Sequence, residues 1–320
     1  MSNKVLIVCS GNSPDGIDFD IKRHHAFIYE QVIMLQKFGV EFDFFYLKGK
    51  GIAGYFLNGY RLWHYLRKHK YAVVHAHNGL SGFIAVMQPF CKTIITFHGS
   101  DINQKKTRLI SNFACLMANY RIFVSSYLYE KLYIKPAKNY SVVPCGINLD
   151  TFFPMDKNDA HRRLNMNENQ TYVLFPSYFS NPAKNYSLAK MAMSLVPEAQ
   201  LLELKNKSRE DVNLLLNAVD VLLVTSPAEG SPQVIKEAMA CNCPIVTTNV
   251  GDVNWVLGNI DGCFISSYEP EDVAEKIKLA IQFRKKYGQT IGRERITELG
   301  LDSVTVAEKI FEVYNKVLKI

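Results

Sequence analysis

The chain has 320 residues, of which 48% are hydrophobic and 21% are charged. This is an ordinary globular composition, and the length suits two domains of about 150 residues each. No apolar run reaches the ~18 residues that a membrane span needs. Met1-Ser-Asn-Lys4 leads directly into an apolar strand and not into a signal peptide, so we expect a cytoplasmic protein.

The net charge of +7 is divided unevenly along the chain. Residues 1–150 hold 18 Lys and Arg against 9 Asp and Glu, whereas residues 151–320 hold 19 against 21, so the positive excess belongs to the first half. The seven cysteines are odd in number and include no C-x-x-C pair, which predicts reduced thiols. Cys241-Asn-Cys243 has the wrong spacing for a metal or redox site, so packing is the favoured interpretation.

The first half alternates apolar strands with longer helical patterns. This βα repeat predicts a parallel, doubly wound sheet. The predicted strands span residues 5–9, 42–47, 73–76, 93–97, 122–125 and 141–143. The predicted helices lie near residues 25–38, near 55–70, after Gly79 and near 110–119.

The same alternation restarts in the second half, where a second Rossmann-like sheet is expected. Pro144, Gly146 and Pro154 bracket a hinge between the two halves. The predicted strands span residues 172–175, 201–204, 221–225, 245–248 and 263–265, and the predicted helices lie near 187–195, 211–219, 231–241 and 271–284. A closing helix over 302–319 has one apolar stripe, made of Val306, Ile310, Val313 and Val317.

Two glutamates eight positions apart, Glu229 and Glu237, mark a loop that turns into a helix. Ser231 is a good N-cap, and Pro232 suits the first helical position. Gly230 lets the backbone approach a ligand, and the unpaired N–H groups of the helix start favour phosphate. Glu237 would lie ~7.5 Å along the helix axis, where its carboxylate can accept hydrogen bonds from ribose while Glu229 faces a sugar.

Three further segments place chemistry-bearing residues after strands, where ligands of open α/β sheets bind. Lys184 precedes Asn185, a favourable N-cap, so that its ammonium and a helix start can converge on phosphate. His98 and Asp101 follow the strand 93–97, and Gly11, in Cys9-Ser-Gly-Asn-Ser-Pro14, follows the first strand and admits donor phosphate or acceptor near the backbone. The alternatives are a solvated lysine, a helix cap at Asp101 and a plain turn at Gly11.

Four ordered motifs resemble those of the retaining glycosyltransferases of family 4. Glu229 and Glu237 match the E-x7-E motif of that family. The other three are Thr96-Phe-His-Gly-Ser-Asp101, which looks like its His-Gly-x-Asp loop, Val143-Pro-Cys-Gly-Ile-Asn148, which looks like its interdomain segment, and Pro182-Ala-Lys-Asn185, which looks like its Lys-Asn phosphate loop. The resemblance implies an α/β protein of GT-B fold, with two Rossmann-like doubly wound parallel-sheet domains facing a cleft.

The resemblance also implies a division of labour along the chain. Residues 1–150 would form the acceptor-binding domain and residues 151–301 the nucleotide-sugar-binding domain. Residues 302–320 would form a helix that crosses back to the first domain.

The same resemblance implies roles for single residues. Lys184 and the helix start at Ser231 would stabilise the departing diphosphate, which needs fixed positive charge as its own charge grows. Glu237 would hold ribose, Glu229 would orient the sugar, and His98 would position the donor without acting as a general base.

The chain departs from the family at Tyr178, which stands where an arginine commonly precedes the lysine. One diphosphate contact is therefore missing, or it is supplied by Lys190, Lys205 or Lys207. The segment 184–220 is also shorter than is usual, which leaves recognition of the base open, so that a UDP-sugar or a GDP-sugar is the expected donor.

Other chemistries fit the sequence less well. The absence of G-x-G-x-x-G weighs against a nicotinamide dehydrogenase. Asp18-Phe-Asp20 precedes a helix near the N-terminus and does not end an interior strand, so no metal is assigned. Residues 61–70 and 105–108 mix bases with aromatics, which suits an anionic membrane surface or a solvated basic helix. Neither half carries a recognisable nucleic-acid-binding motif.

The expected function is retaining, metal-independent transfer of a hexosyl or N-acetylhexosaminyl group from a nucleotide-diphosphate sugar to a glycan or lipid-linked acceptor. The expected setting is cell-surface polysaccharide synthesis in the cytoplasm or on the inner face of the membrane. A sugar-nucleotide epimerase of the same fold is one alternative. A nucleotide-sugar-binding protein with impaired catalysis is another, favoured by the tyrosine in place of arginine.

Overall fold

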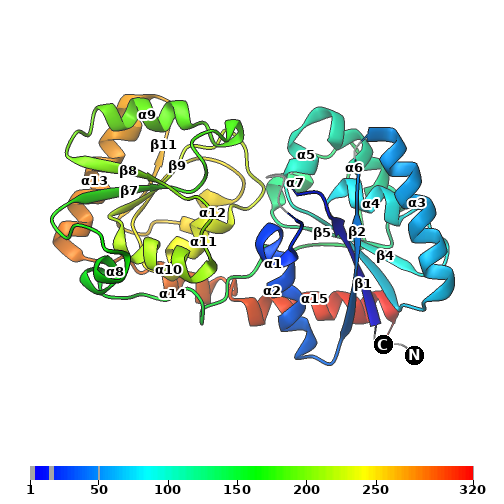
Figure 1. Ribbon diagram of the computed structural model, residues 1–320. Coiled ribbons are helices and arrows are strands. Elements are labelled where there is room, and N and C mark those ends of the chain that lie inside the picture. Colours follow the sequence, from blue (N-terminus) through cyan, green and yellow to red (C-terminus); the bar gives the residue numbers. More distant parts are fainter. Residues whose placement is uncertain (1–3, 14–17, 50, 320) are drawn as a thin grey trace. The chain divides into compact units, whose positions relative to one another are not determined.

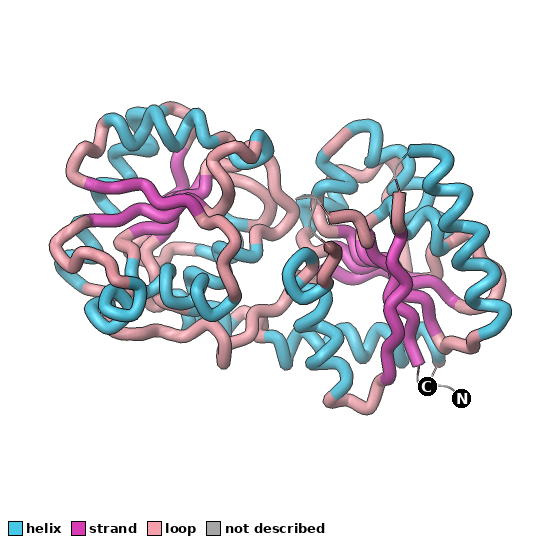
Figure 2. The backbone as a smooth tube through the Cα atoms, viewed as in Figure 1, coloured by secondary structure: helices cyan, strands magenta, loops and turns pink. Residues whose placement is uncertain are grey.

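The computed structural model describes residues 4–13, 18–49 and 51–319, so Met1 to Asn3 and Pro14, named above, lie outside the described residues. The chain divides into two compact units: unit 1 is Met1–Gly146 with Ser303–Ile320, and unit 2 is Ile147–Asp302. Each unit holds a parallel sheet between layers of helices (Figures 1 and 2). The predicted pair of doubly wound α/β sheets is confirmed.

Unit 1 has a six-stranded parallel sheet in the order β2-β1-β3-β4-β5-β6. Its strands are β1 (Lys4–Ser10), β2 (Glu41–Leu47), β3 (Val73–His77), β4 (Lys92–Phe97), β5 (Tyr120–Phe123) and β6 (Tyr140–Val142). Its described helices are α1 (Ile21–His24), α2 (Ala26–Gln36), α3 (Gly51–Lys68), α4 (Gly79–Ala85), α5 (Ser100–Asn103), α6 (Lys105–Met117), α7 (Ser126–Glu130) and α15 (Ser303–Leu318).

Alternate side chains of β1 are buried in two separate hydrophobic cores, one on each face of the sheet of unit 1. Leu6 and Val8 point to a core shared with α3, α4 and α6, whereas Val5 and Ile7 point to a core shared with α2 and α15. Because helices cover both faces, the strand can be apolar at every position, as is typical of a parallel sheet.

Helix α15 closes the second of these cores. Its predicted apolar stripe is buried, and it packs beside α2 on one face of the sheet of unit 1 (Figure 1). The Tyr314 hydroxyl lies 2.7 Å from Nδ1 of His75, a fully buried histidine on β3. Residues from the end of the chain therefore complete unit 1 by both apolar and polar contacts.

Unit 2 has a five-stranded parallel sheet in the order β11-β10-β9-β7-β8. Its strands are β7 (Thr171–Phe175), β8 (Ala199–Glu203), β9 (Val221–Val224), β10 (Ile245–Thr248) and β11 (Cys263–Ser266). Its described helices are α8 (Lys157–Leu164), η1 (Pro182–Lys184, a 3₁₀ turn), α9 (Tyr186–Ser194), α10 (Arg209–Ala218), α11 (Gln233–Ala240), α12 (Val253–Leu257), α13 (Pro270–Tyr287) and α14 (Gly292–Glu298).

The α-helices that the sequence did not predict are the shorter ones: α1, α5, α7, α8, α12 and α14. Each has eight residues or fewer, so hydrophobic periodicity cannot establish itself within it. Helix α8 is instead specified by a local cap, since the Asp156 side chain accepts from the N–H groups of Asn158 and Asp159. Within the described part of the chain, no helix is both long and apolar enough to cross a membrane.

The Tyr314→Phe substitution tests how much the hydrogen bond between Tyr314 and His75 stabilises unit 1. We expect a loss of about 1–2 kcal/mol in the free energy of unfolding, because the buried Nδ1 of His75 loses its partner. Urea denaturation measures this loss. The control is Tyr287→Phe at an exposed position, which should stay within about 0.5 kcal/mol of the parent; equal effects of the two changes would contradict the assignment.

Candidate functional site

Two ion pairs lie in the loops and helix starts that follow the strands of unit 2. Nζ of Lys184 lies 2.5 Å from Oε1 of Glu229. Nη1 of Arg209 pairs with Oε1 of Glu237, whose side chain is buried. The structure thus gives each of the two glutamates of the E-x7-E pattern its own cation. Carboxylates and cations gathered beyond the carboxyl ends of parallel strands form a polar site at the edge where such sheets bind ligands.

Lys184 ends the 3₁₀ turn η1 and stands just before the start of α9. Asn185 occupies the N-cap position of α9 as predicted, but it adopts a left-handed conformation (φ 53°, ψ 52°) and its side chain makes no cap bond. The turn η1 is itself capped by Asn181, which accepts from the N–H of Ala183 at 3.1 Å. The hydroxyl of Thr225, just after β9, donates to the carbonyls of Lys184 and Asn185 and fixes the turn to the sheet.

Ser231 is not the N-cap of α11. The helix begins at Gln233, and Pro232 is the cap residue in an extended conformation (φ −66°, ψ 115°), which places Ser231 one residue outside. The Ser231 hydroxyl lies 3.2 Å from Nζ of Lys236, a fully buried lysine. The neighbouring Asp252 is also buried, and this burial raises the pKa of its carboxyl, while the charge of Lys236 lowers that pKa.

The loop that carries Glu229 packs against the backbone of Gly251. Gly251 has a φ of +60°, and a Cβ built on it would lie 2.5 Å from the carbonyl oxygen of Gly230. The two backbones can touch only because residue 251 has no side chain. This contact accounts for the glycine at residue 251, and the predicted approach of Gly230 to a ligand stays a prediction.

Arg209 is the functional candidate that the sequence prediction missed. It opens α10, where the Ser208 side chain and Asp211 form a capping box that fixes the helix start. The guanidinium lies 4.5 Å from the centroid of the Phe152 ring, at its face, and reaches Glu237 on α11. Its signal was its place after the strand 201–204, the same rule that selected Lys184 and His98.

The structure also distinguishes the three lysines proposed to replace the missing arginine. Lys205 lies over Tyr178, with Nζ 5.7 Å from the ring centroid. The Tyr178 hydroxyl in turn donates to Oδ1 of Asn206 at 2.9 Å. Lys190, Lys205 and Lys207 are all exposed. Lys205 by its contact with Tyr178, and Arg209 by its pair with Glu237, are the two cations of the β8–α10 segment that the structure connects to this part of unit 2.

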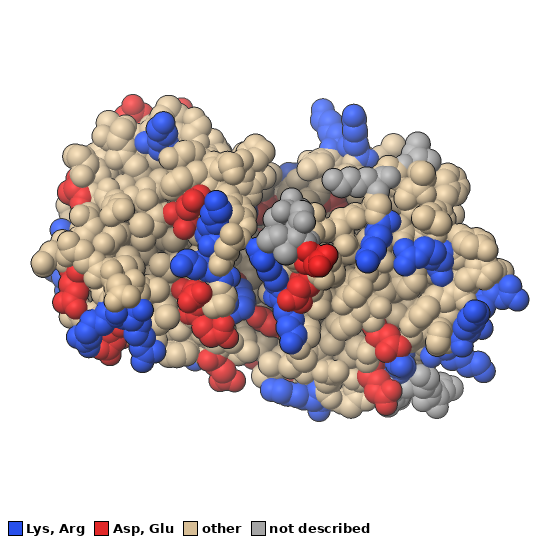
Figure 3. Space-filling model, viewed as in Figure 1, with Lys and Arg blue, Asp and Glu red and all other residues tan. Residues whose placement is uncertain are grey.

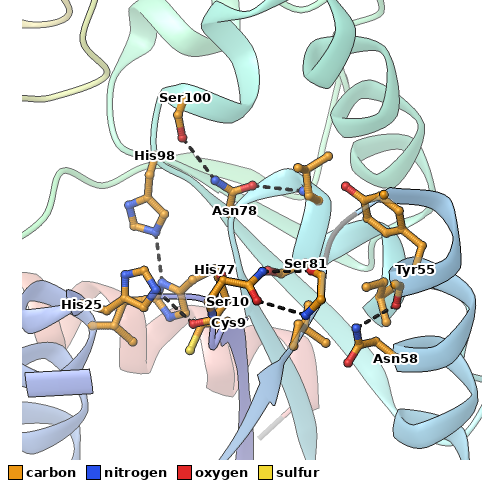
Figure 4. A pocket seen from close by; sticks show the side chains of 18 of the residues that line it. Cys9, Ser10, His25, Tyr55, Asn58, His77, Asn78, Ser81, His98 and Ser100 are labelled. Atoms are coloured by element: carbon orange, nitrogen blue, oxygen red, sulfur yellow. Dashed lines mark hydrogen bonds between the residues drawn. The ribbon is translucent and has the colours of Figure 1, made fainter. Parts of the chain in front are cut away.

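Unit 1 contains a separate pocket of about 630 Å³ beyond the ends of β1, β3 and β4. Figure 4 shows His98 reaching down toward His77, with Tyr55 and Asn58 of α3 on the opposite side. The described lining residues include no Asp, Glu, Lys or Arg. The pocket therefore presents neutral polar groups beside apolar walls, a surface suited to an uncharged, hydroxyl-rich ligand.

Histidines line the deeper part of this pocket. Nδ1 of His77 lies 3.0 Å from Nε2 of His98, whose Nδ1 lies 3.7 Å from Sγ of Cys145. Nε2 of His77 is buried, with no hydrogen-bond partner among the described residues. His77 also stacks on His75, at a centroid separation of 4.5 Å. His77 is the second functional candidate that the sequence prediction missed, and a ligand hydroxyl is the natural partner for its open nitrogen.

The buried histidines are neutral. Burial lowers the pKa of His75 from 6.5 to about 3. Burial lowers the pKa of His77 well below its ordinary value, with smaller contributions from His75, His98 and His25. Burial likewise lowers the pKa of His25, opposed by a hydrogen bond to the Ser10 carbonyl. At neutral pH these rings can donate or accept hydrogen bonds but carry no charge.

Asp101 and Gly11 have structural roles here. The buried Asp101 carboxylate accepts from the N–H groups of Gly79 and Gly99 at 2.8 Å each, and so joins the loops that follow β3 and β4. Burial raises its pKa, while these hydrogen bonds lower it. Gly11 donates its N–H to the Leu47 carbonyl, and a Cβ there would lie 2.7 Å from Cβ of Tyr46. Phosphate binding at Gly11 stays a prediction.

Comparison with known proteins gives the same family in both halves of the chain. Residues 22–151 match a family model described as Glycosyltransferase Family 4, and residues 159–295 match one described as Glycosyl transferases group 1. A curated relative is the UDP-Gal:alpha-D-GlcNAc-diphosphoundecaprenol alpha-1,3-galactosyltransferase of Escherichia coli, 26% identical over 64% of this chain and 65% of the relative. The match thus spans less than two thirds of that relative.

Solved structures share the fold over nearly the whole chain. A sucrose-phosphate synthase from Thermosynechococcus elongatus superimposes with a TM-score of 0.82 at 16% identity, covering 99% of both chains. Anabaena Alr3699/HepE in complex with UDP superimposes with a TM-score of 0.74 at 15% identity, covering 98% of this chain and 100% of that one. The chain belongs to the family 4 type of glycosyltransferases and has the GT-B fold.

The neutral histidines predict that unit 1 loses stability in mild acid. Because the folded-state pKa of His75 lies near 3 and the unfolded value near 6.5, the unfolded state binds the extra proton between these values. The contribution of His75 is complete above pH 6.5 and is lost as pH falls, at about 1.4 kcal/mol per pH unit. Urea denaturation between about pH 7 and pH 5 measures the free energy of unfolding of the parent and of His75→Gln. The slope of this free energy against pH should be smaller in the variant, by the amount that corresponds to one proton bound on unfolding. An unchanged slope would exclude His75 as the source.

A Cβ at residue 251 should loosen the Glu229 loop. Gly251→Ala forces contact with the Gly230 carbonyl, and overpacking of this kind costs about 1–3 kcal/mol. Hydrogen exchange measured by mass spectrometry should then speed up over residues 229–233. Gly288→Ala is the control, since Gly288 also has a positive φ but a Cβ there meets nothing within 4 Å. Unaltered exchange of the loop in Gly251→Ala would refute the packing role.

Proposed function

We propose that this protein transfers a sugar from a nucleoside-diphosphate sugar, bound by unit 2, to a glycan or lipid-linked acceptor received by unit 1. The observation that carries this proposal is the double pairing of Lys184 with Glu229 and of Arg209 with Glu237. A lone signature glutamate has many structural explanations. Two glutamates, each held beside a cation beyond the ends of parallel strands, form a site with the charges that a nucleotide sugar needs.

The cations supply the main chemical requirement of the transfer. As the bond between the anomeric carbon and the diphosphate oxygen breaks, its electron pair goes to the leaving group. Lys184 and Arg209 stabilise that growing negative charge, so we infer that no metal ion is required. The acceptor oxygen bonds to the anomeric carbon on the face that the diphosphate leaves, which retains the configuration, and its proton passes to the donor phosphate.

The carboxylates bind the neutral parts of the donor. In this proposal Glu237, which is buried beside Arg209, accepts hydrogen bonds from ribose hydroxyls. Glu229 lies in the preceding loop, which Gly251 holds in place, and it orients the transferred sugar. In this proposal a donor phosphate takes up Lys184 when it enters, so Glu229 exchanges its ammonium partner for sugar hydroxyls.

The pocket of unit 1 supports an acceptor sugar there. Its neutral lining suits hydroxyl groups better than a diphosphate, and Nε2 of His77 offers an unused hydrogen-bonding position. His98, held by His77, is the residue of this unit that we assign to positioning at the reaction centre.

Relatives supply the chemical class of donor and acceptor. The Escherichia coli relative is named for UDP-Gal and for a diphosphoundecaprenol acceptor, and Alr3699/HepE is known in complex with UDP and with UDP-glucose. We therefore propose a UDP-hexose or UDP-N-acetylhexosamine as donor, with a GDP-sugar as the second choice. Cell-surface polysaccharide synthesis on the cytoplasmic side of the membrane is the setting that such an acceptor implies.

The two alternative functions make different products. An epimerase of this fold would change the sugar nucleotide and leave the acceptor unextended, and a binding protein would leave both unchanged. The loss of the family's arginine favoured the second alternative, but Lys205, over the Tyr178 ring, and Arg209 supply two other cations from the β8–α10 segment. This is our reason for favouring transfer, which mass spectrometry identifies by a lengthened acceptor.

Three substitutions test the donor site: Lys184→Ala, Arg209→Ala and Glu237→Ala. Each should lower kcat about 10²- to 10³-fold, the usual effect of removing one group that stabilises transition-state charge or orients the donor. Release of nucleoside diphosphate measures donor hydrolysis without an acceptor, and mass spectrometry measures transfer. The exposed Lys278→Ala on α13 is the control and should keep the parent rate. Parent-like rates in all three variants would reject this site.

A further inference from the structure

The outer face of α3 is unusually apolar for a helix on a protein surface. Phe56 is 72% exposed and Tyr60 is 63% exposed, one helical turn apart on the same stripe. Trp63 continues this stripe, and the guanidinium of Arg67 lies 4.7 Å from the centroid of its indole ring. The opposite face, with Asn58, Leu62 and Leu66, is buried. Both faces of α3 thus carry apolar side chains, whereas a surface helix ordinarily has only one apolar face.

Helix α6 repeats this arrangement. Its exposed face carries Leu109, 67% exposed, and Phe113, 51% exposed, followed by Leu116 and Met117. The helix opens with two exposed lysines, Lys105 and Lys106, one turn before Leu109. Exposed apolar side chains and bases therefore share the solvent side of α6, as they share that of α3.

A groove of about 600 Å³ joins these helices into one surface. Tyr55, Phe56, Tyr60 and Trp63 of α3 line one side, and Phe83 and Met87, in and after α4, line the other. Ile110 of α6 completes the groove. In Figure 1, α3, α4 and α6 lie next to one another on the same side of the sheet of unit 1. We call the exposed parts of α3 and α6, with the groove between them, the apolar–basic face.

The charge around this face has one sign. From Phe44 to Tyr129 the sequence contains eleven Lys and Arg and a single acidic residue, Asp101. Asp101 is buried, so it contributes no surface charge that could neutralise the bases. On the side drawn in Figure 3, Lys and Arg atoms lie along α3, and no Asp or Glu atoms of the described residues are seen over that helix.

We propose that the apolar–basic face docks unit 1 on a bilayer that contains anionic phospholipids. Exposed aromatic and aliphatic side chains enter the interface between headgroups and acyl chains, and bases beside them bind lipid phosphates. Isolated exposed apolar residues are ordinary, but a continuous patch of this kind marks an interaction site.

The charge pattern selects this occupant over a second copy of the chain. A symmetric dimer through the same face would set the two basic rims against each other, with no exposed acid between residues 44 and 129 to pair with them. An anionic bilayer complements both the apolar stripes and the bases. The inference goes beyond the proposed function and does not rest on it, since docking needs neither a donor nor an acceptor.

Vesicle flotation with the full chain tests the proposal. Vesicles of phosphatidylcholine mixed with phosphatidylglycerol should carry the protein with them, and vesicles of phosphatidylcholine alone should carry much less. The Arg67→Gln, Lys105→Gln, Lys106→Gln triple variant should bind the mixed vesicles about 10²-fold more weakly, because each base near a lipid surface contributes about a five-fold factor. The Phe56→Ser, Tyr60→Ser, Leu109→Ser triple variant should bind both kinds of vesicle at least about ten-fold more weakly.

Matched changes in unit 2 are the controls. Trp255→Ser with Tyr287→Ser removes exposed aromatics, and Lys278→Gln with Lys285→Gln removes exposed lysines. Both control variants should float like the parent, and circular dichroism should show every variant folded, since all the changed side chains are exposed or lie at the surface.

Three results would overturn the proposal. The first is parent-like flotation of both triple variants. The second is that the parent does not bind vesicles and instead forms a dimer in analytical ultracentrifugation, which the changes at Phe56, Tyr60 and Leu109 dissociate. The third is stronger binding to a single-stranded oligonucleotide than to mixed vesicles, which would assign the bases to nucleic acid.

Discussion

The structure of the candidate donor site depends on one constraint: charged groups that are removed from water must be paired. Glu237 is buried within α11, and Arg209 reaches it from the neighbouring helix start. That pair ties α10 to α11. The Lys184–Glu229 pair ties the loop after β7 to the loop after β9 in the same way. The charges that would meet a nucleotide sugar are therefore also the contacts that hold its loops in register.

Backbone contacts reinforce this pairing. The Thr225 hydroxyl fixes the turn that ends in Lys184, and the absence of a side chain at Gly251 lets the Glu229 loop lie against it. A ligand that displaced Lys184 from Glu229 would find both loops already positioned. Little ordering of these loops would then oppose binding, which is the physical benefit of a preorganised site.

The sequence predicted the long elements and the strand-end residues well, because apolar periodicity and strand-to-helix order act locally. Its errors arose where a single backbone angle decides the outcome: the left-handed Asn185 holds the N-cap position without a side-chain cap bond, and the extended Pro232 moves Ser231 outside the helix. It missed Arg209 because its partner Glu237 is 28 residues away. Two-residue alternation does place His75 and His77 on one face of β3, but only the neighbouring strand and α15 reveal that both are buried.

The positive charge of unit 1 lies on its surface and not in its pocket. A net positive half suggests a binding domain for an anionic donor, yet the described lining of its pocket has no charged side chain and its buried histidines are neutral. Several of the bases that are exposed to solvent lie on α3, on the residues just after it and on α6. A pocket that selects among neutral sugars, as we propose, gains nothing from a strong electric field, because hydroxyl groups are distinguished by hydrogen-bond geometry.

The same electric field is useful on the outer face, where it attracts a surface of fixed negative charge. A charged outer face and a neutral pocket are therefore compatible within unit 1.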